Sequence, residues 1–210
     1  MVIAIDGPAG SGKSTIARNI ASHLGWYFLN TGSFYRAYTL AQLDKNLDPL
    51  DKDSVLKTAE DTVITVENGN ICINGINGED RLHTPIVDKY ASPVSSDPRL
   101  REKVTAEVRK LAGNMNIVTE GRDTTTVIFP NAEYKFYFDA SPEVRARRRL
   151  LEQPELKYEE VLEGILKRDK NDKEKPVGAL KIAENAIYVD TTNLTIDGVC
   201  EKVYIAMQKH

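Results

Sequence analysis

Residues 7–14 read GPAGSGKS, which has the spacing G-x-x-x-x-G-K-[ST] of a phosphate-binding loop. Glycines allow the backbone to turn its N–H groups toward an anion, and a helix that follows adds partial positive charge at its N-terminus. Lys13 can reach the outer phosphates of a nucleoside triphosphate, and Ser14 or Thr15 offers a hydroxyl to Mg²⁺ and a phosphate. We therefore expect a nucleoside triphosphate to be bound by Gly7, Pro8, Ala9, Gly10, Ser11, Gly12, Lys13, Ser14 and Thr15.

A second group of charged residues stands in TEGRDTTTVIFP, residues 119–130. The apolar pair Ile117 and Val118 precedes it and is typical of a buried strand. Because strand ends in open α/β sheets point at the ligand crevice, we expect Glu120, Arg122 and Asp123 to lie in a ligand site.

Triphosphate binding alone does not name the reaction. A GTPase switch requires an N-K-x-D segment, which the strings LDKN and KNDKEK do not supply. A motor or transporter ATPase is usually larger and has a strand of four apolar residues ending in Asp, whereas NIVTE is short and ends in Glu. The remaining class transfers the γ-phosphoryl group to a small acceptor, which requires several arginines around two sets of phosphates.

Arginines stand at suitable places for such a transfer. Arg36 follows the second expected strand, Arg122 follows the third, and Arg168 lies late in the chain. Taken singly, Arg101 and the RARRR run at 145–149 are more typical of a solvated surface, and Arg36 fits either interpretation.

Apolar runs of strand length alternate with helical patterns along most of the chain. Expected strands cover residues 2–5, 26–29, 116–123, 133–140 and 186–190. Expected helices cover residues 13–24, 31 or 32 onward, 55–60, 85–91, 98–112, 141–152, 157–172 and 195–207. Between residues 62 and 78, β-branched runs flank an Asn-Gly turn, which indicates an antiparallel hairpin. The alternation predicts an α/β fold that carries a small inserted hairpin.

Composition excludes several functional classes. The 210 residues have a formal net charge of −3, so no basic field indicates a nucleic-acid or membrane partner. The two cysteines, Cys72 and Cys200, lie far apart, which excludes a disulfide scaffold or a zinc cluster and fits a reducing compartment. MVIAID is too short for a signal peptide, and no run approaches the roughly 18 residues of a membrane helix. We expect a cytoplasmic monomer.

Several longer segments occur in a fixed order: IDGPAGSGKST, NTGSFYRA, SPVSSDPRLRE, EGRDTTTVIFPNA, ASPEVRARRR, KRDKND and YVDTT. In this order and approximate spacing the chain resembles the bacterial cytidylate kinases from end to end. The resemblance implies a P-loop NTPase-type, three-layer α/β/α fold with a parallel five-stranded core sheet. It also implies a single kinase domain, with an acceptor-binding insertion at about 61–92 and a helical lid at about 142–175.

The resemblance further implies how the acceptor CMP is held. Thr31, Arg36 and Arg122 would contact its phosphate, and Arg168 and Asp172 would reach its sugar. The cytosine would be read by Ser92, Arg101 and Asp123. Asp123 would accept from the exocyclic amine, a donor that uracil lacks.

Residues at the transferring phosphoryl group also follow from the resemblance. Lys13 and Lys175 would stand near that group, and Arg147 and Arg149 are candidates for closing the lid over the triphosphate. Ser14 and Glu120 would lie beside Mg²⁺.

The chain departs from the family's usual residues at a few positions. Glu120 replaces an Asp, Lys175 replaces an Arg, and Thr125 and Ser14 stand where glycine is frequent. A lysine cannot make the bidentate contact of an arginine, so a looser acceptor clamp is expected at Lys175.

The sequence therefore predicts a kinase that moves the γ-phosphoryl of ATP to CMP or dCMP, with Mg²⁺ as cofactor. Two alternatives stay open at this point. Another small acceptor, such as UMP, AMP, shikimate or dephospho-coenzyme A, would keep the kinase, and a nucleotide-dependent regulatory module would not be an enzyme.

Overall fold

Strand β1 (Val2–Asp6) lies at the centre of a five-stranded sheet in the computed structural model, which describes residues 1–67, 69–113 and 115–208. The strand order is β2-β6-β1-β7-β8, with β2 at Tyr27–Asn30, β6 at Ile117–Gly121, β7 at Tyr134–Asp139 and β8 at Ile187–Asp190. β1 pairs in parallel with β6 and β7, and β7 pairs in parallel with β8. The parallel five-stranded sheet expected from the sequence is confirmed.

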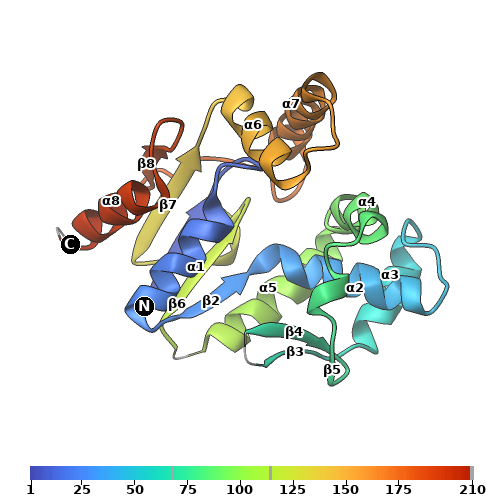
Figure 1. The fold of residues 1–210 in the computed structure, drawn as a ribbon. Helices are drawn as coiled ribbons and strands as arrows, with labels where there is room; N and C mark the ends of the chain where they lie inside the picture. The colour runs from blue at the N-terminus through green and yellow to red at the C-terminus, as the bar shows by residue number, and fades with distance from the viewer. Residues whose placement is uncertain (68, 114, 209–210) are drawn as a thin grey trace. The chain divides into compact units, whose positions relative to one another are not determined.

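Helices α1 (Lys13–Leu24) and α8 (Ile196–Gln208) pack together and contribute to the core around β1 and β7 (Figure 1). Ile16 and Ile20 of α1 are four residues apart, as are Val199 and Val203 of α8, so each helix turns one apolar stripe inward. They share this core with Phe136 of β7. Burial of each such side chain stabilises the fold by about 1.5–3 kcal/mol. This packing holds the sheet in place behind the phosphate loop.

Helices α6 (Pro142–Glu152) and α7 (Tyr158–Glu174) pack side by side after β7 (Figure 1). The Ser141 hydroxyl accepts a hydrogen bond from the Val144 N–H and caps α6, with Pro142 in its first turn. Asp172 is the one fully buried residue of α7, and the apolar Val161, Leu162 and Ile165 are half-buried. Polar contacts of α7 therefore add to its apolar packing in placing this helix.

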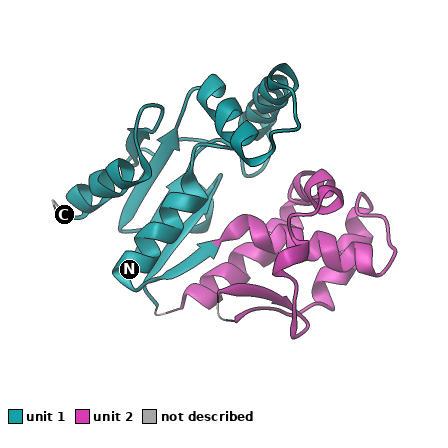
Figure 2. Cartoon of the chain, viewed as in Figure 1, with its two compact units in different colours: residues 1–29, 114–210 teal, residues 30–113 magenta. Residues whose placement is uncertain are grey.

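The chain divides into two compact units, which Figure 2 shows in different colours. Unit 1 comprises residues 1–29 and 114–210, and unit 2 comprises residues 30–113. Unit 2 contains α2 (Thr31–Asp44), α3 (Lys52–Glu60), α4 (Pro85–Val94), α5 (Pro98–Ala112) and an antiparallel sheet of β3 (Ile64–Glu67), β4 (Asn70–Ile73) and β5 (Ile76–Asn77). It has its own core, which includes Phe34, Tyr38, Leu82 and Leu100. The insertion proposed at residues 61–92 lies within unit 2.

Some expected boundaries were wrong, each for a local reason. Helix α3 begins at Lys52 rather than residue 55, because the Asp51 carboxylate caps it by accepting from the Asp53 and Ser54 N–H groups. Helix α4 continues past Pro93, since the Ser95 N–H still reaches the Ala91 carbonyl.

The expected hairpin has a third strand, β5, and Asn68 of its first Asn-Gly pair lies outside the described residues. Residues beyond β6 form a π-helical turn, η2 (Thr124–Ile128), which no sequence pattern indicated. Among the described residues, no helix is both long and apolar enough to cross a membrane.

Candidate active site

The phosphate loop joins β1 to α1, as the sequence predicted. Gly7 has φ 151, and a Cβ there would lie 1.9 Å from the Phe138 carbonyl oxygen of the neighbouring strand. Only glycine allows the loop to leave the sheet at this point without displacing β7. The loop then enters α1 at Gly12, directly before Lys13.

Lys13 is folded back onto its own loop. Its ammonium donates to the Pro8 carbonyl at 2.7 Å and to the Ser11 hydroxyl at 3.4 Å, and the residue is buried. Burial, together with the positive charge of Arg122, lowers the pKa of Lys13 to about 7, although the charge of Glu120 opposes this shift. A phosphate placed in the loop would supply the negative charge that this buried ammonium lacks.

Ser14 and Glu120, the two expected magnesium ligands, lie together. The Ser14 hydroxyl donates to Glu120 Oε1 at 2.8 Å. Hydroxyl and carboxylate oxygens are the hard ligands that Mg²⁺ prefers, so the pair fits this ion. Within the described residues no group of three or more His, Cys, Asp or Glu side chains could hold a metal, so phosphate oxygens and water would have to complete its coordination.

Asp6, at the end of β1, holds the turn that follows Arg122 and Asp123. Its carboxylate accepts from the Thr124 N–H at 2.9 Å, the Thr125 N–H at 2.7 Å and the Thr125 hydroxyl at 2.6 Å. Burial raises the pKa of Asp6, although these hydrogen bonds oppose the shift. Glycine at residue 125 could not donate the third bond, so Thr125 gives this chain an extra anchor for the turn.

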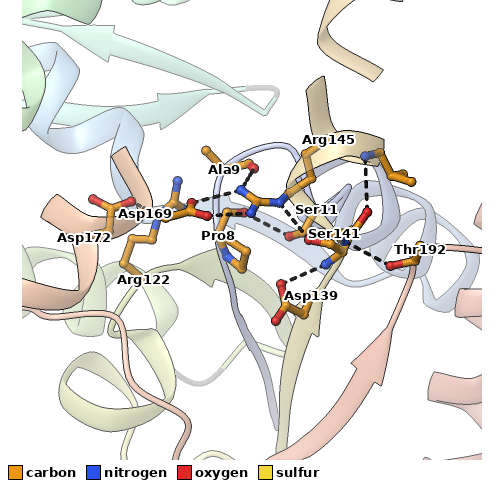
Figure 3. A network of polar contacts seen from close by, with 12 residues as sticks. Pro8, Ala9, Ser11, Arg122, Asp139, Ser141, Arg145, Asp169, Asp172 and Thr192 are labelled. Atoms are coloured by element: carbon orange, nitrogen blue, oxygen red, sulfur yellow. Dashed lines mark hydrogen bonds and ion pairs between the residues drawn. The ribbon is translucent and has the colours of Figure 1, made fainter. Parts of the chain in front are cut away.

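Arg122, Asp172 and Lys175 form a charge cluster at the end of β6. Figure 3 shows Arg122 beside Asp172, and Arg122 Nε donates to Asp172 Oδ2 at 2.8 Å. Lys175 Nζ lies 3.2 Å from Asp172 Oδ1. Burial alone would raise the pKa of Asp172, but the positive charges and the Arg122 hydrogen bond outweigh it and hold the pKa below the ordinary value. Arg168 contributes to the same field, because its charge lowers the pKa of both Asp172 and Lys13. Four residues that the sequence assigned to the acceptor or the transferring group therefore act on one another.

The composition of the arginine run in α6 indicated a uniformly solvated face. The structure shows instead that these arginines differ in exposure. Arg145 is buried and ion-paired with Asp169 of α7. Arg148 donates to the Thr191 carbonyl at 2.7 Å. Arg147 and Arg149, the expected lid arginines, are exposed, and Arg149 lies 3.4 Å from Glu152.

The sequence analysis missed Arg145 and Asp169. No local signal separated Arg145 from its neighbours, because Arg149, one turn later on the same side of α6, is exposed. Figure 3 shows Arg145 directed at Ala9 and Asp169, with Arg122 beside Asp172.

The end of β8 and the residues that follow it border a cavity of about 650 Å³ in unit 1. Asp190 and Thr192 line it together with Pro8 of the phosphate loop and Tyr188 of β8. The Ser141 N–H donates to the Thr192 hydroxyl at 3.0 Å, which joins the segment after β8 to the start of α6.

The acceptor residues expected in unit 2 are Thr31, Arg36, Ser92 and Arg101. Thr31 is buried at the start of α2, where the Asn30 side chain caps the helix by accepting from the Gly32 N–H. Arg36, one turn later, is ion-paired with Asp88 of α4. This ion pair therefore holds the guanidinium of Arg36 in place within unit 2.

Arg101 is buried although the sequence alone favoured a surface position. Its guanidinium donates to the Ser95 carbonyl at 2.9 Å and lies 5.2 Å from the centre of the Tyr35 ring. Ser92 is exposed on α4, one turn before Ser95. A guanidinium fixed by a carbonyl and an aromatic face is oriented rather than free to rotate, as recognition of a base requires.

The family model described as cytidylate kinase matches residues 3–209. A cytidylate kinase of Caldanaerobacter subterraneus subsp. tengcongensis is 42% identical over 212 residues, which cover 99% of this chain and 95% of that protein. One from Clostridium botulinum is 39% identical over 211 residues, covering 99% of this chain and 97% of that protein.

Solved structures share the fold at low identity. An uncharacterized protein from Eubacterium ventriosum superposes with a TM-score of 0.55 at 11% identity, covering 100% of this chain and 99% of that chain. TT1252 from Thermus thermophilus gives 0.51 at 18% identity, with 100% and 96% coverage. These likenesses concern the fold alone.

Proposed function

The chain belongs to the cytidylate kinase family, and we propose that it transfers the γ-phosphoryl group of ATP to CMP or dCMP, giving ADP and CDP or dCDP. The observation that carries the proposal is the family match over nearly the whole chain. The phosphate loop is its physical counterpart, because it joins β1 to α1 and holds the buried Lys13 against the Pro8 carbonyl.

Donor binding rests on the loop and Lys13. The backbone N–H groups of residues 7–14 and the N-terminus of α1 would surround the β- and γ-phosphates. Bound phosphate would draw the Lys13 ammonium away from the Pro8 carbonyl and restore its charge. That charge would then offset the negative charge that develops on the transferring group.

Acceptor binding would place the CMP phosphate against Arg122. The Nε of this guanidinium donates to Asp172, so a phosphate dianion would compete with that carboxylate for the arginine. Asp172 would then be available for a ribose hydroxyl. The acceptor oxygen is already ionised and attacks in line, so the site needs no strong general base.

Asp123 would select the base. It is buried directly after Arg122, in the turn that Asp6 anchors, so its position is defined by several backbone hydrogen bonds. As a carboxylate it accepts from the cytosine amine and offers nothing to the uracil carbonyl at the same place. Arg101 and Ser92 of unit 2 would supply the remaining base contacts.

Mg²⁺ would be held by Ser14 and Glu120 with phosphate oxygens. The ion supplies charge neutralisation between the β- and γ-phosphates when it is bound. Glu120 accepts a hydrogen bond from the Ser14 hydroxyl and so holds that hydroxyl beside its own carboxylate.

Helices α6 and α7 belong to the lid region proposed at residues 142–175. Closure over the triphosphate would remove water and limit hydrolysis of ATP, with Arg147 and Arg149 as candidates for contacting it. Both are exposed and can therefore move toward a ligand without loss of core packing.

We also propose that the protein is a cytoplasmic monomer without a nucleic-acid partner. Its cysteines, Cys72 and Cys200, are buried free thiols, as in proteins of reducing compartments, and its net charge is −3. Size-exclusion chromatography with light scattering would test the oligomeric state.

The experiment is a product analysis. The protein is incubated with ATP, Mg²⁺ and CMP, and the nucleotides are separated by anion-exchange chromatography. Equal amounts of ADP and CDP are expected. ADP formed without CDP would show hydrolysis alone and would overturn the proposal.

A further inference from the structure

Arg145 is the largest fully buried side chain of the described residues, with 2% of its surface exposed. A buried guanidinium is costly unless its charge and donors are matched. Its NH1 and NH2 atoms donate to the two carboxylate oxygens of Asp169 at 2.9 and 2.5 Å. This forked pairing uses the planar geometry that only arginine offers.

The remaining donors of Arg145 reach two other segments. Nε donates to the Ala140 carbonyl at the end of β7, at 2.8 Å, and NH1 also donates to the Ala9 carbonyl of the phosphate loop, at 3.2 Å. Gly10 has φ 77, and a Cβ there would lie 3.2 Å from the Arg145 Cβ. The loop backbone therefore lies directly on the stem of Arg145 as well as on its guanidinium.

The ion pair also determines where α7 stands. Asp169 directly follows Arg168 in sequence and lies one turn before Asp172. Arg168 and Asp172 are the residues assigned to the acceptor sugar. Beside the half-buried apolar residues Val161, Leu162 and Ile165, α7 is anchored by its ion pair with Arg145 and, through Asp172, by that with Arg122. Losing one of these anchors would let the acceptor residues shift relative to Lys13.

We propose that Arg145 and Asp169 are positioning residues that clamp α7 to the phosphate loop, so that Arg168 and Asp172 stand at a fixed place relative to the triphosphate. Neither residue touches substrate in this role. The clamp couples the acceptor side of the site to the donor side. For its kinetic consequence the inference rests on the proposed function.

The kinetic test uses Arg145→Lys, Asp169→Asn and the double variant. Arg145→Lys keeps the positive charge but loses the pair of parallel hydrogen bonds to Asp169. Asp169→Asn keeps the shape of the side chain but loses its negative charge. Each single variant is expected to lower kcat for transfer to CMP by about 10- to 100-fold, because small displacements of positioned groups have effects of that size. The KM for ATP is expected to change far less, and the fraction of ATP hydrolysed without transfer is expected to rise.

The double variant is expected to be no worse than the more impaired single variant, since either change breaks the same clamp. Matched controls are Arg109→Lys on α5 and Glu163→Gln on α7, both at exposed positions. Additive losses, or an unchanged ratio of hydrolysis to transfer, would overturn the proposal.

A second readout does not depend on CMP. Hydrogen exchange measured by mass spectrometry on Arg145→Lys and Asp169→Asn is expected to rise in residues 7–14 and in α7 together, with α8 as the unaffected reference. A rise in only one of the two segments would contradict the clamp. If the wild type fails to phosphorylate CMP, the proposed function falls while this measurement still decides the clamp. If Arg145→Lys does not fold, Asp169→Asn carries both measurements.

Discussion

The Ser14 hydroxyl donates a 2.8 Å hydrogen bond to Oε1 of Glu120, across 106 residues of sequence. The contact arises because β6 pairs with β1, with Ile5 opposite Glu120, so the end of β6 stands beside the start of α1. Two oxygen ligands from separate segments thus meet next to the loop that would hold the phosphates. The pair suggests how a glutamate serves where the family usually has an aspartate.

The carboxylate of Glu120 should be essential for use of Mg²⁺, while its length should matter less. Glu120→Gln is expected to raise the Mg²⁺ concentration for half-maximal rate by about 10- to 100-fold, because it removes a charged oxygen beside the ion. Glu120→Asp retains the charge and is the matched control. The measurement is a magnesium titration of the transfer rate, and equal midpoints for Glu120→Gln and wild type would exclude a role at the metal.

Replacing Lys13 with methionine should abolish transfer and leave the fold intact. The substitution keeps most of the side-chain volume but removes the charge that faces the transferring phosphoryl group, so a loss of at least about 10²–10³-fold in kcat is expected. Lys110→Met, at an exposed position of α5, is the control. Turnover near the wild-type rate, with circular dichroism unchanged, would remove Lys13 from the mechanism.

Nucleotide binding should take up a proton at pH 8. The pKa of Lys13 is lowered to about 7 in the free protein, so its amine is mostly neutral at that pH, and bound phosphates would return it to the charged form. Calorimetric titration with a non-hydrolysable ATP analogue, in buffers of different ionisation enthalpy, should show uptake approaching one proton. Lys13→Met should show none from this residue, and equal uptake by both proteins would contradict the assignment.

The same shift predicts how stability depends on pH. Between about pH 7 and the ordinary lysine value of 10.5, the unfolded chain holds a proton on Lys13 that the folded chain has lost. The free energy of unfolding should therefore rise with pH across this window, and its excess slope over Lys13→Met should be at most about 1.4 kcal/mol per pH unit. Urea unfolding of both proteins at several pH values measures this difference.

The Thr125 hydroxyl should stabilise the fold through Asp6. Thr125→Val has the same shape but leaves one oxygen of the buried Asp6 carboxylate short of a donor, so a loss of about 1–3 kcal/mol is expected in urea unfolding. Thr125→Ser keeps the hydroxyl and should lose clearly less. Equal stability of the valine and serine variants would show that the 2.6 Å contact contributes nothing.

Much of the fold could be predicted from the sequence, because its signals are local. The helix at Lys13–Leu24 follows from a glycine-rich turn and an apolar stripe, and that at Pro98–Ala112 from Asp97, Pro98 and Gly113 at its ends. The strands follow from short runs of β-branched and aromatic residues. The predicted helix boundaries were wrong where a capping side chain sets the first residue of the helix, as Asp51 does for α3.

The site could be predicted only in part. Residues such as Glu120 and Arg122 lie at the expected edge of the sheet, because topology brings strand ends together there. The roles assigned to them stay predictions. Arg145 was not found, since an arginine within RARRR has the composition of a solvated face. Its burial depends on Asp169 from another helix, a pairing that no local pattern specifies.

The most direct test of the account is acceptor choice, measured as ADP release with ATP and Mg²⁺ against CMP, dCMP, UMP, AMP and no acceptor. The wild type should be stimulated strongly by CMP and dCMP, and Asp123→Asn should lower the CMP-to-UMP ratio of kcat/KM by about 10-fold or more, since its amide no longer offers only acceptors to the base. Stimulation by another acceptor in place of CMP would contradict the cytosine assignment. No stimulation by any acceptor would contradict the kinase reaction itself.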